Sequence, residues 1–191
     1  MLEEEIKFIL ELDKMKSVYR RTYITSGDRR ENDAEHSFHI ALMAHLLKDY
    51  ADKPIDVDRV CKMLLAHDLV EIDAGDTFAY DTKGYEDKNE RELKAANRLY
   101  GLLKEDQGKE FFDLWLEFEE MKTNDSLYAN AMDRLQPIMM NYYGKVATWA
   151  LYPISREMVY KRLEPIREIS NQLWTYACNI VDDYFDKHKG L

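Results

Sequence analysis

Apolar residues recur at helical spacing along most of the chain. Near the amino terminus Leu2, Ile6 and Ile9 repeat every three or four residues, with glutamates and lysines between them. Similar patterns follow over residues 34–50, after Asp56, and over residues 85–104, 109–122, 124–137, 155–163 and 167–187. No stretch shows the sustained alternation of a strand. The pattern predicts an all-α protein, a helical bundle of about seven to nine helices.

Turn-forming residues separate these helices. Residues 19–33 and 72–84 read as loops, and residues 105–108 read as a break between two helices. Asp56 is expected to cap one helix, and Asn124 or Asp125 another. Pro137 lies inside the helix that begins near residue 124, where it should kink or break it.

Composition narrows the class of protein. The length of 191 residues predicts one domain covering residues 1–191. Lys and Arg number 27 against 37 Asp and Glu, and the net charge of −10 argues against a nucleic-acid-binding protein. The acidic amino terminus and the lack of a run of ~18 apolar residues argue against secretion and membrane insertion. Cys61 and Cys178 are far apart and read as buried small hydrophobes, so we expect a cytoplasmic protein.

The segment His67-Asp68-Leu69-Val70-Glu71 carries the strongest chemical signal. Adjacent imidazole and carboxylate groups can bind one divalent metal ion, and Glu71 lies close enough along a helix to overlook the same spot. A metal-activated water beside a carboxylate is a hydrolytic pair. The alternative is a helix-capping histidine beside surface carboxylates. The apolar run over residues 63–66 favours the metal site, because it predicts that His67 and Asp68 come directly after a helix packed in the core.

Further candidate ligands lie elsewhere in the chain. His36 and His39 are three residues apart, so both could face one site. Asp133 is an acid within an apolar helix, where a structural ion pair is the alternative to metal binding. Arginines at positions 20, 21, 29 and 30 form a cationic group before His36 that could bind an anion. For Arg29 we expect a structural ion pair within its loop.

The order of these residues resembles that of a known family. His36, the pair His67-Asp68 and Asp133 follow the H…HD…D order of the HD-domain metal-dependent phosphohydrolases. The flanks Arg29-x-Glu31-Asn32-x-x-Glu35-His36-Ser37, then His67-Asp68-x-x-Glu71 with Asp76 beyond, look similar to YfbR-type 5′-deoxynucleotidases. The resemblance covers about residues 5–145. It implies a metal-site core over about residues 20–145.

The resemblance also implies a role for each matching residue. One divalent cation (Mn, Co, Mg, Fe, Ni or Zn) would be held by His36, His67, Asp68 and Asp133. Glu71 would protonate the leaving sugar oxygen or orient the attacking water, and Asp76 would lie near the sugar. An arginine would orient the phosphate. The spacing to His36 favours Arg21, but the residues before the pair favour Arg20, and we expect Arg20 to take this role, with Arg21 as the alternative.

The nucleoside end of the expected site departs from the family. YfbR-type enzymes carry Trp after the arginine, whereas this chain has Arg21 and then Thr22. The stretch Thr77-Phe78-Ala79-Tyr80 is unusually aromatic. Phe78 and Tyr80 could stack on a base, at ~1–3 kcal/mol each, or pack onto the core.

The implied substrate is a small phosphate ester, a (deoxy)nucleoside 5′-monophosphate. Two alternatives are another phosphoester, such as a phosphodiester, pyrophosphate or alarmone-type nucleotide, and a non-catalytic nucleotide-binding HD dimer. The resemblance further implies a homodimer. Helices over residues 152–188 would pack on the core or form the dimer face.

Overall fold

The predicted apolar faces pack together in a helical fold with one small β-ribbon. The computed structural model describes residues 2–188, and within them eight helices have ten or more residues and two have four. The all-α expectation is confirmed. The α-helices are α1 (Leu2–Leu12), α2 (Asp33–Leu47), α3 (Val57–Ala66), α4 (Glu71–Ala74), α5 (Lys88–Tyr100), α6 (Glu105–Glu120), α7 (Asn124–Tyr143), α8 (Thr148–Leu151), α9 (Arg156–Ile169) and α10 (Asn171–Lys187). Short 3₁₀ turns η1 (Asp13–Ser17) and η2 (Lys48–Tyr50) follow α1 and α2.

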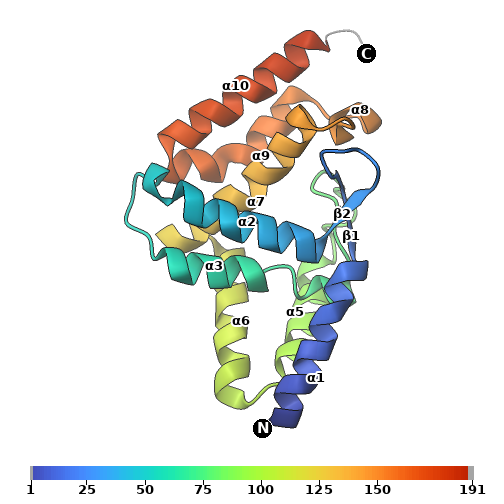
Figure 1. Ribbon diagram of the computed structural model, residues 1–191, viewed down its shortest axis with the longest axis vertical. Coiled ribbons are helices and arrows are strands. Elements are labelled where there is room, and N and C mark those ends of the chain that lie inside the picture. The colour runs from blue at the N-terminus through green and yellow to red at the C-terminus, as the bar shows by residue number, and fades with distance from the viewer. Residues whose placement is uncertain (1, 189–191) are drawn as a thin grey trace.

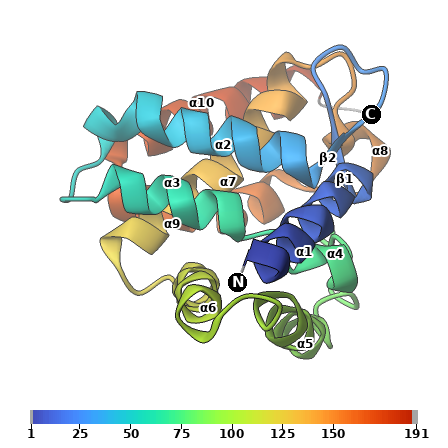
Figure 2. The ribbon, with the colours of Figure 1, turned by 60° about the horizontal axis from the view of Figure 1, so that its bottom comes forward.

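Two apolar clusters form the core. In the larger, α2 packs against α3 and α7, and α9 and α10 cover α7 from the other side (Figure 1). In the smaller, α1 and η1 pack with α5 and α6, which lie side by side (Figure 2). Helix α3 contributes Met63 and Leu64 to the larger cluster and Ala66 to the smaller. The end of α3, where His67 and Asp68 follow, therefore lies where the two clusters meet.

The segment expected to be a loop over residues 19–33 contains strands. β1 (Tyr19–Tyr23) pairs antiparallel with β2 (Arg30–Asn32). The turn between them holds Gly27 at φ 76°, a conformation that favours glycine. The loop prediction was wrong for these eight residues because such short strands depend on pairing with each other rather than on a long alternating pattern.

The helix break expected over residues 105–108 is absent, and of the kink or break expected at Pro137 the break does not occur. Helix α7 continues through Pro137, since burial of its flanking residues offsets the ~3 kcal/mol that an internal proline costs. Residues 105–108 form the first turn of α6. Gly108 is required there by close approach, because a Cβ would lie 2.4 Å from the carbonyl oxygen of Tyr100.

The helix caps follow the expected chemistry with one shift in position. The Asp56 side chain accepts hydrogen bonds from the backbone N–H groups of Asp58 and Arg59, as predicted. Helix α7 is capped by Thr123 rather than by Asn124 or Asp125. The threonine hydroxyl and Ser126 form a reciprocal capping box, which leaves Asn124 and Asp125 inside the first turn of the helix rather than at its cap.

The last two helices cover the core. Leu163, Ile166, Ile169 and Leu173 are buried in the larger cluster. Helix α9 runs past its predicted end at Leu163, and α10 begins at Asn171, after the Ser170 cap. Cys61 and Cys178 are free thiols, half-buried rather than fully buried as predicted. None of the helices over residues 2–188 has the length and apolar character needed to cross a membrane.

Candidate metal centre and catalytic cavity

Four side chains from three helices converge at the junction of the two clusters. His36 lies one turn into α2, His67 and Asp68 follow α3, and Asp133 lies in the middle of α7. Asp133 Oδ1 is 3.1 Å from His36 Nε2 and 3.8 Å from His67 Nε2. Asp68 Oδ1 is 3.0 Å from His67 Nε2. Ligand atoms about 2.0–2.2 Å from one ion are spaced at about these distances.

His67 is oriented for binding a cation. Its Nδ1 lies 2.7 Å from the carbonyl oxygen of Leu64, a position in which Nδ1 carries the proton and donates it. The Nε2 lone pair then faces the Asp68 carboxylate, and this buried atom makes no hydrogen bond in the described part of the chain. Two acceptors so close repel each other unless a positive charge lies between them. The residues present therefore fit a metal ion.

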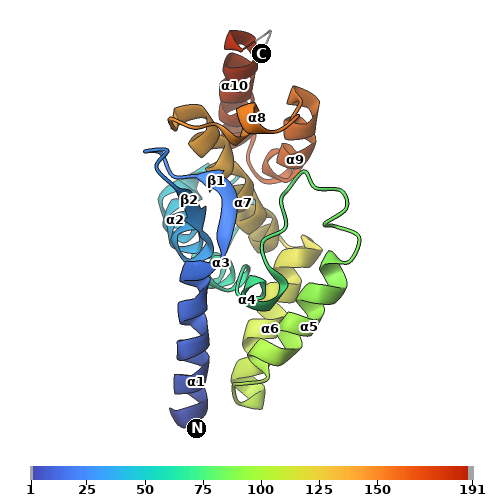
Figure 3. The same ribbon diagram turned by 90° about the vertical axis from the view of Figure 1, so that its right-hand side faces the viewer.

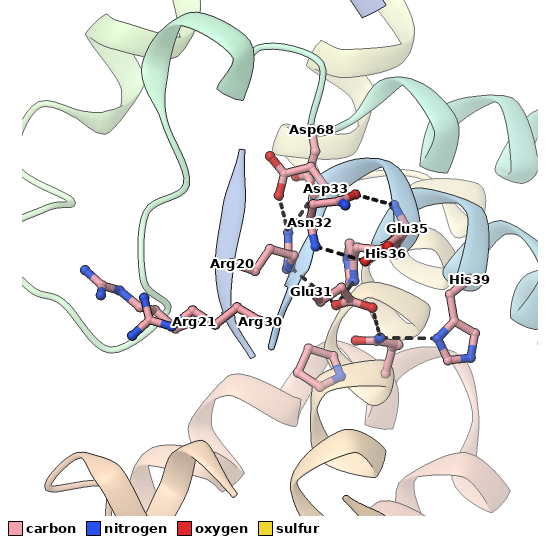
Figure 4. Close-up of polar contacts among 12 residues, drawn as sticks. Arg20, Arg21, Arg30, Glu31, Asn32, Asp33, Glu35, His36, His39 and Asp68 are labelled. Carbon is pink, nitrogen blue, oxygen red and sulfur yellow. Dashed lines mark hydrogen bonds and ion pairs between the residues drawn. The ribbon is translucent and has the colours of Figure 1, made fainter. Parts of the chain in front are cut away.

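A second layer of contacts holds His36. Its Nδ1 lies 3.3 Å from Glu31 Oε2, and the other oxygen of Glu31 accepts a hydrogen bond from Gln136 Nε2 at 2.7 Å. Carboxylates behind metal-binding histidines orient the ring and raise its basicity. The Asn32–Glu35 capping box begins α2 just before His36 and places the ring within the core. Figure 4 shows Glu31 beside His36.

The two candidate arginines point in different directions. On β1 successive side chains face opposite sides of the strand, so only one of them can reach the metal centre. Arg20 Nη1 donates to Asp68 Oδ2 at 2.7 Å, and its guanidinium also lies 3.7–3.9 Å from Asp133, Asp33 and Glu31. Arg21 is exposed and points away from Asp68 (Figure 4).

Glu71 lies in an acidic, buried setting. It begins α4, it is 7% exposed, and its Oε2 has no hydrogen-bond partner within residues 2–188. Burial raises the pKa of Glu71 well above its usual range, and the negative charges of Asp68, Asp33 and Asp76 raise it further. Burial likewise raises the pKa of Asp33 to about 7. This arrangement holds a proton on Glu71 that it can donate.

The carboxylates at the metal centre behave in the opposite way. Burial by itself would raise the pKa of Asp68, but the positive charge of the Arg20 guanidinium, 2.7 Å away, opposes this effect and lowers that pKa. Asp68 therefore stays ionised beside a protonated Glu71. A charged carboxylate and a neutral one side by side are the pairing that acid-assisted hydrolysis uses.

The remaining predicted residues line two adjoining spaces. We call the metal cavity the space of ≈ 210 Å³ whose lining includes His67, Asp68, Glu71, Asp76 and Asp133. The inner cavity, ≈ 60 Å³, is lined by Arg20, Arg21, Thr22, Asp76, Thr77, Phe78, Ala79, Tyr80, Arg134, Pro137, Ile138, Asn141, Thr148, Trp149 and Arg162. Asp76 and Thr77 face both, because Gly75 at φ 75° ends α4 and turns the chain back along α7 (Figure 3).

Phe78 and Tyr80 pack as well as line the inner cavity. Their rings lie 5.4 Å apart, and Phe78 lies 4.9 Å from the ring of Tyr152. Tyr80 is also packed against the larger core cluster. Both alternatives considered for these aromatic residues are thus compatible with their positions.

Two other residues considered from the sequence lie outside the metal centre. His39 Nδ1 is 3.3 Å from Gln136 Nε2, and His39 lies apart from His36, His67 and Asp133, whose ligand atoms are close enough together to hold a metal ion. Arg29 binds Glu35 through both terminal nitrogens, at 2.8 and 2.6 Å, which confirms the structural role expected for it.

Several residues around the site were given no role from the sequence. Glu31 and Gln136 support His36 from 105 positions apart, so no local motif links them. Trp149 and Arg162 reach the inner cavity from beyond the region of resemblance. Arg134 directly follows the candidate ligand Asp133, and this position alone could have suggested that it lines the metal cavity.

The chain is similar to known proteins over most of its length. The HD domain family matches residues 12–174. The 5′-deoxynucleotidase HDDC2 of Dictyostelium discoideum is 31% identical over 143 residues, which are 72% of this chain and 75% of that protein. Human HDDC2 is 29% identical over 135 residues, 70% of this chain and 65% of its own length. A solved structure described as a predicted metal-dependent phosphohydrolase from Magnetospirillum magnetotacticum MS-1 has a TM-score of 0.92 and 47% identity, covering 98% of this chain and 96% of that one.

Proposed function

The chain belongs to the HD-domain family, and from this we propose that it is a metal-dependent hydrolase that converts (deoxy)nucleoside 5′-monophosphates to nucleoside and phosphate. The observation that carries the proposal is the convergence of His36, His67, Asp68 and Asp133 beside a buried Glu71. The names of the HDDC2 relatives support the substrate class.

In the proposed mechanism the four converging side chains would hold one divalent cation. Such an ion lowers the pKa of water and offsets charge on a phosphoryl group. Water attacks phosphorus, the bond from phosphorus to the 5′-oxygen breaks, and Glu71 donates its proton to the departing oxygen. The proton lost by the attacking water then restores Glu71. Of the two roles considered for Glu71, proton donor and orienter of the attacking water, we favour the proton donor. Burial and the surrounding acidic residues raise the pKa of Glu71, so its carboxyl group holds a proton to donate.

We propose that the nucleoside lies over the segment that begins at Asp76. Asp76 and Thr77 line both the metal cavity and the inner cavity, so they can contact a sugar whose phosphate is at the metal centre. Phe78 and Tyr80 follow in the same segment and line the inner cavity, where their rings could contact a base.

Arg20, rather than Arg21, is proposed to orient the phosphate. We expect Arg20→Ala to raise KM for nucleotide substrates by about tenfold or more, the scale of one lost hydrogen bond to a charged group. Arg21→Ala is the comparison variant, one position along the strand, where the side chain lines the inner cavity but not the metal cavity. Steady-state kinetics of both variants test this assignment, and a larger effect at Arg21 would reverse it.

The proposed activity is tested by phosphate release from a panel of 5′-ribo- and 5′-deoxyribonucleotides. The protein is stripped of metal and supplied with Mn, Co or Mg, and Asp68→Ala is assayed alongside. We expect release from deoxynucleoside monophosphates that disappears in the variant. Release only from di- or triphosphates or from diesters would assign the site to another phosphoester, and no release from any of these would leave a binding module.

Assembly, domain organisation and location complete the proposal. We propose one domain, active as a homodimer in the cytoplasm. Helix α2 exposes an apolar stripe of Phe38, Leu42 and Leu46, which are 68%, 47% and 67% exposed and suit burial against a second copy. The free thiols Cys61 and Cys178 fit a reducing compartment. Light scattering that gives the mass of a monomer, 22.7 kDa, would contradict the dimer.

A further inference from the structure

Two arginines lie where three hollows of the molecule meet. Beyond the metal cavity and the inner cavity lies an outer hollow of ≈ 600 Å³, lined by Ala79, Tyr80, Thr82, Tyr85, Arg134, Met158, Lys161 and Arg162. Within residues 2–188, Arg134 of α7 and Arg162 of α9 alone line all three spaces. The two arginines therefore lie at the boundary that the outer hollow shares with the metal cavity.

The other cations of the metal cavity are already neutralised. Arg20 lies within 4 Å of four carboxylates, the nearest being Asp68 at 2.7 Å. Lys88 Nζ lies 2.8 Å from Glu92 and 3.5 Å from Glu119. Arg20 can still direct an N–H group at a phosphate oxygen, but neighbouring carboxylates compensate most of the positive charge of both side chains.

Arg134 and Arg162 lack such partners. In the described part of the chain Arg134 contacts no carboxylate within 4 Å. Its Nη2 lies 3.2 Å from Asn130 Oδ1 and 3.3 Å from the sulfur of Met121, and its buried Nε has no hydrogen-bond partner. Arg162 reaches one carboxylate, Asp133 Oδ2, at 3.8 Å from its Nη2. Two half-buried guanidinium groups with so little negative charge near them form a strong binding site for an anion.

We propose that Arg134 and Arg162 clamp the phosphate dianion of the substrate at the mouth of the metal centre. The proposal rests on the proposed function. The two carboxylates Asp68 and Asp133 would neutralise a divalent cation, so a doubly charged phosphate monoester needs positive charge from elsewhere. The distance from Arg162 to Asp133 puts that charge beside the metal-binding residues. The planar guanidinium groups match two phosphate oxygens each, whereas a neutral ligand would leave both charges unpaired.

Titration of inorganic phosphate into the Mg²⁺-loaded protein tests the clamp by calorimetry without turnover. We expect Arg162→Gln and Arg134→Gln each to weaken phosphate binding by about tenfold to a hundredfold. Arg162→Lys keeps the positive charge but loses the paired N–H donors of the guanidinium group, so its phosphate affinity should lie between those of wild type and Arg162→Gln. Arg167→Gln is the matched control, because it removes one exposed charge from the same helix and lines none of the three spaces. Metal content and thermal unfolding of each variant establish that the fold is intact.

The results separate the clamp from the proposed activity. Phosphate affinity equal to wild type in both glutamine variants, or no phosphate binding by wild type at millimolar concentration, would overturn the clamp even if nucleotides are hydrolysed. Arginine-dependent phosphate binding in a protein that hydrolyses no nucleotide would uphold the clamp and reject the nucleotide as substrate. If Arg134→Gln does not fold, Arg162→Gln decides the question, since among the described residues Arg162 forms one ion pair, with Asp133 at 3.8 Å, whereas Arg134 donates hydrogen bonds to Asn130 and Met121.

Discussion

His67→Ala is expected to yield a folded protein that no longer retains metal and releases phosphate at least roughly 10³-fold more slowly. The His67 ring is oriented for binding a cation. Its Nδ1 donates a hydrogen bond to the Leu64 carbonyl oxygen, so Nε2 carries a lone pair where it faces the Asp68 carboxylate. Loss of a catalytic ion removes several kcal/mol of stabilisation from the transition state, and each 1.36 kcal/mol is tenfold in rate.

Metal analysis of the purified protein, together with the phosphate-release assay, measures this effect. His67→Gln is the companion variant, because it keeps most of the side-chain volume against Phe118, whose ring centroid lies 4.8 Å from that of His67. His45→Ala on the exposed face of α2 is the control and should change neither metal content nor rate. Stoichiometric metal with normal turnover in His67→Ala would remove this residue from the site.

Glu71→Ala and Glu71→Gln are expected to keep metal and fold but to lose turnover by roughly 10²-fold or more. The carboxyl group lies in the metal cavity without a hydrogen-bond partner for Oε2, so removing it breaks no structural contact through that oxygen. Asp73→Asn, two residues farther along α4 and paired with Arg98 on the surface, is the matched control. Retained activity in the Glu71 variants would exclude Glu71 from the mechanism.

The pH profile separates an acid from a base at this position. Burial and neighbouring acids raise the pKa of Glu71, so the carboxyl stays protonated below that raised pKa and loses its proton as the pH rises through it. If Glu71 is the proton donor, the rate falls on the alkaline side, and Glu71→Gln lacks that fall because its amide does not titrate. A rate that instead rises over this pH range in the wild-type protein would assign Glu71 the role of base.

Local patterns in the sequence were enough to predict the helices and the chemistry of the ligand set. Helical spacing of apolar residues depends only on the geometry of one helix, so it was readable for α1, α2, α3 and α10 without knowledge of their partners. The pair His67-Asp68 and its spacing to Glu71 were readable for the same reason, since one turn of chain brings them together. The resemblance to HD-domain phosphohydrolases then linked these residues to His36 and Asp133.

Contacts between distant segments were decided by the tertiary structure. Only packing shows that α7 passes through Pro137 without ending and that Gly108 lets α6 approach Tyr100. The choice between Arg20 and Arg21 depends on which side of β1 faces Asp68, and β1 forms only because β2 pairs with it. Strand pairing is a contact between segments, so a single segment does not encode it.

The same distinction separates the parts of the site itself. The sequence by itself determined which side chains can bind a metal ion and donate a proton, because those abilities belong to the residue types and their local spacing. The tertiary structure decided the surroundings that make them useful. It places Glu31 and Gln136 behind His36, raises the pKa of Glu71 by burial among acids, and leaves Arg134 and Arg162 with little compensating charge. Burial and charge compensation depend on every segment that surrounds a group, and therefore emerge only once the chain has folded.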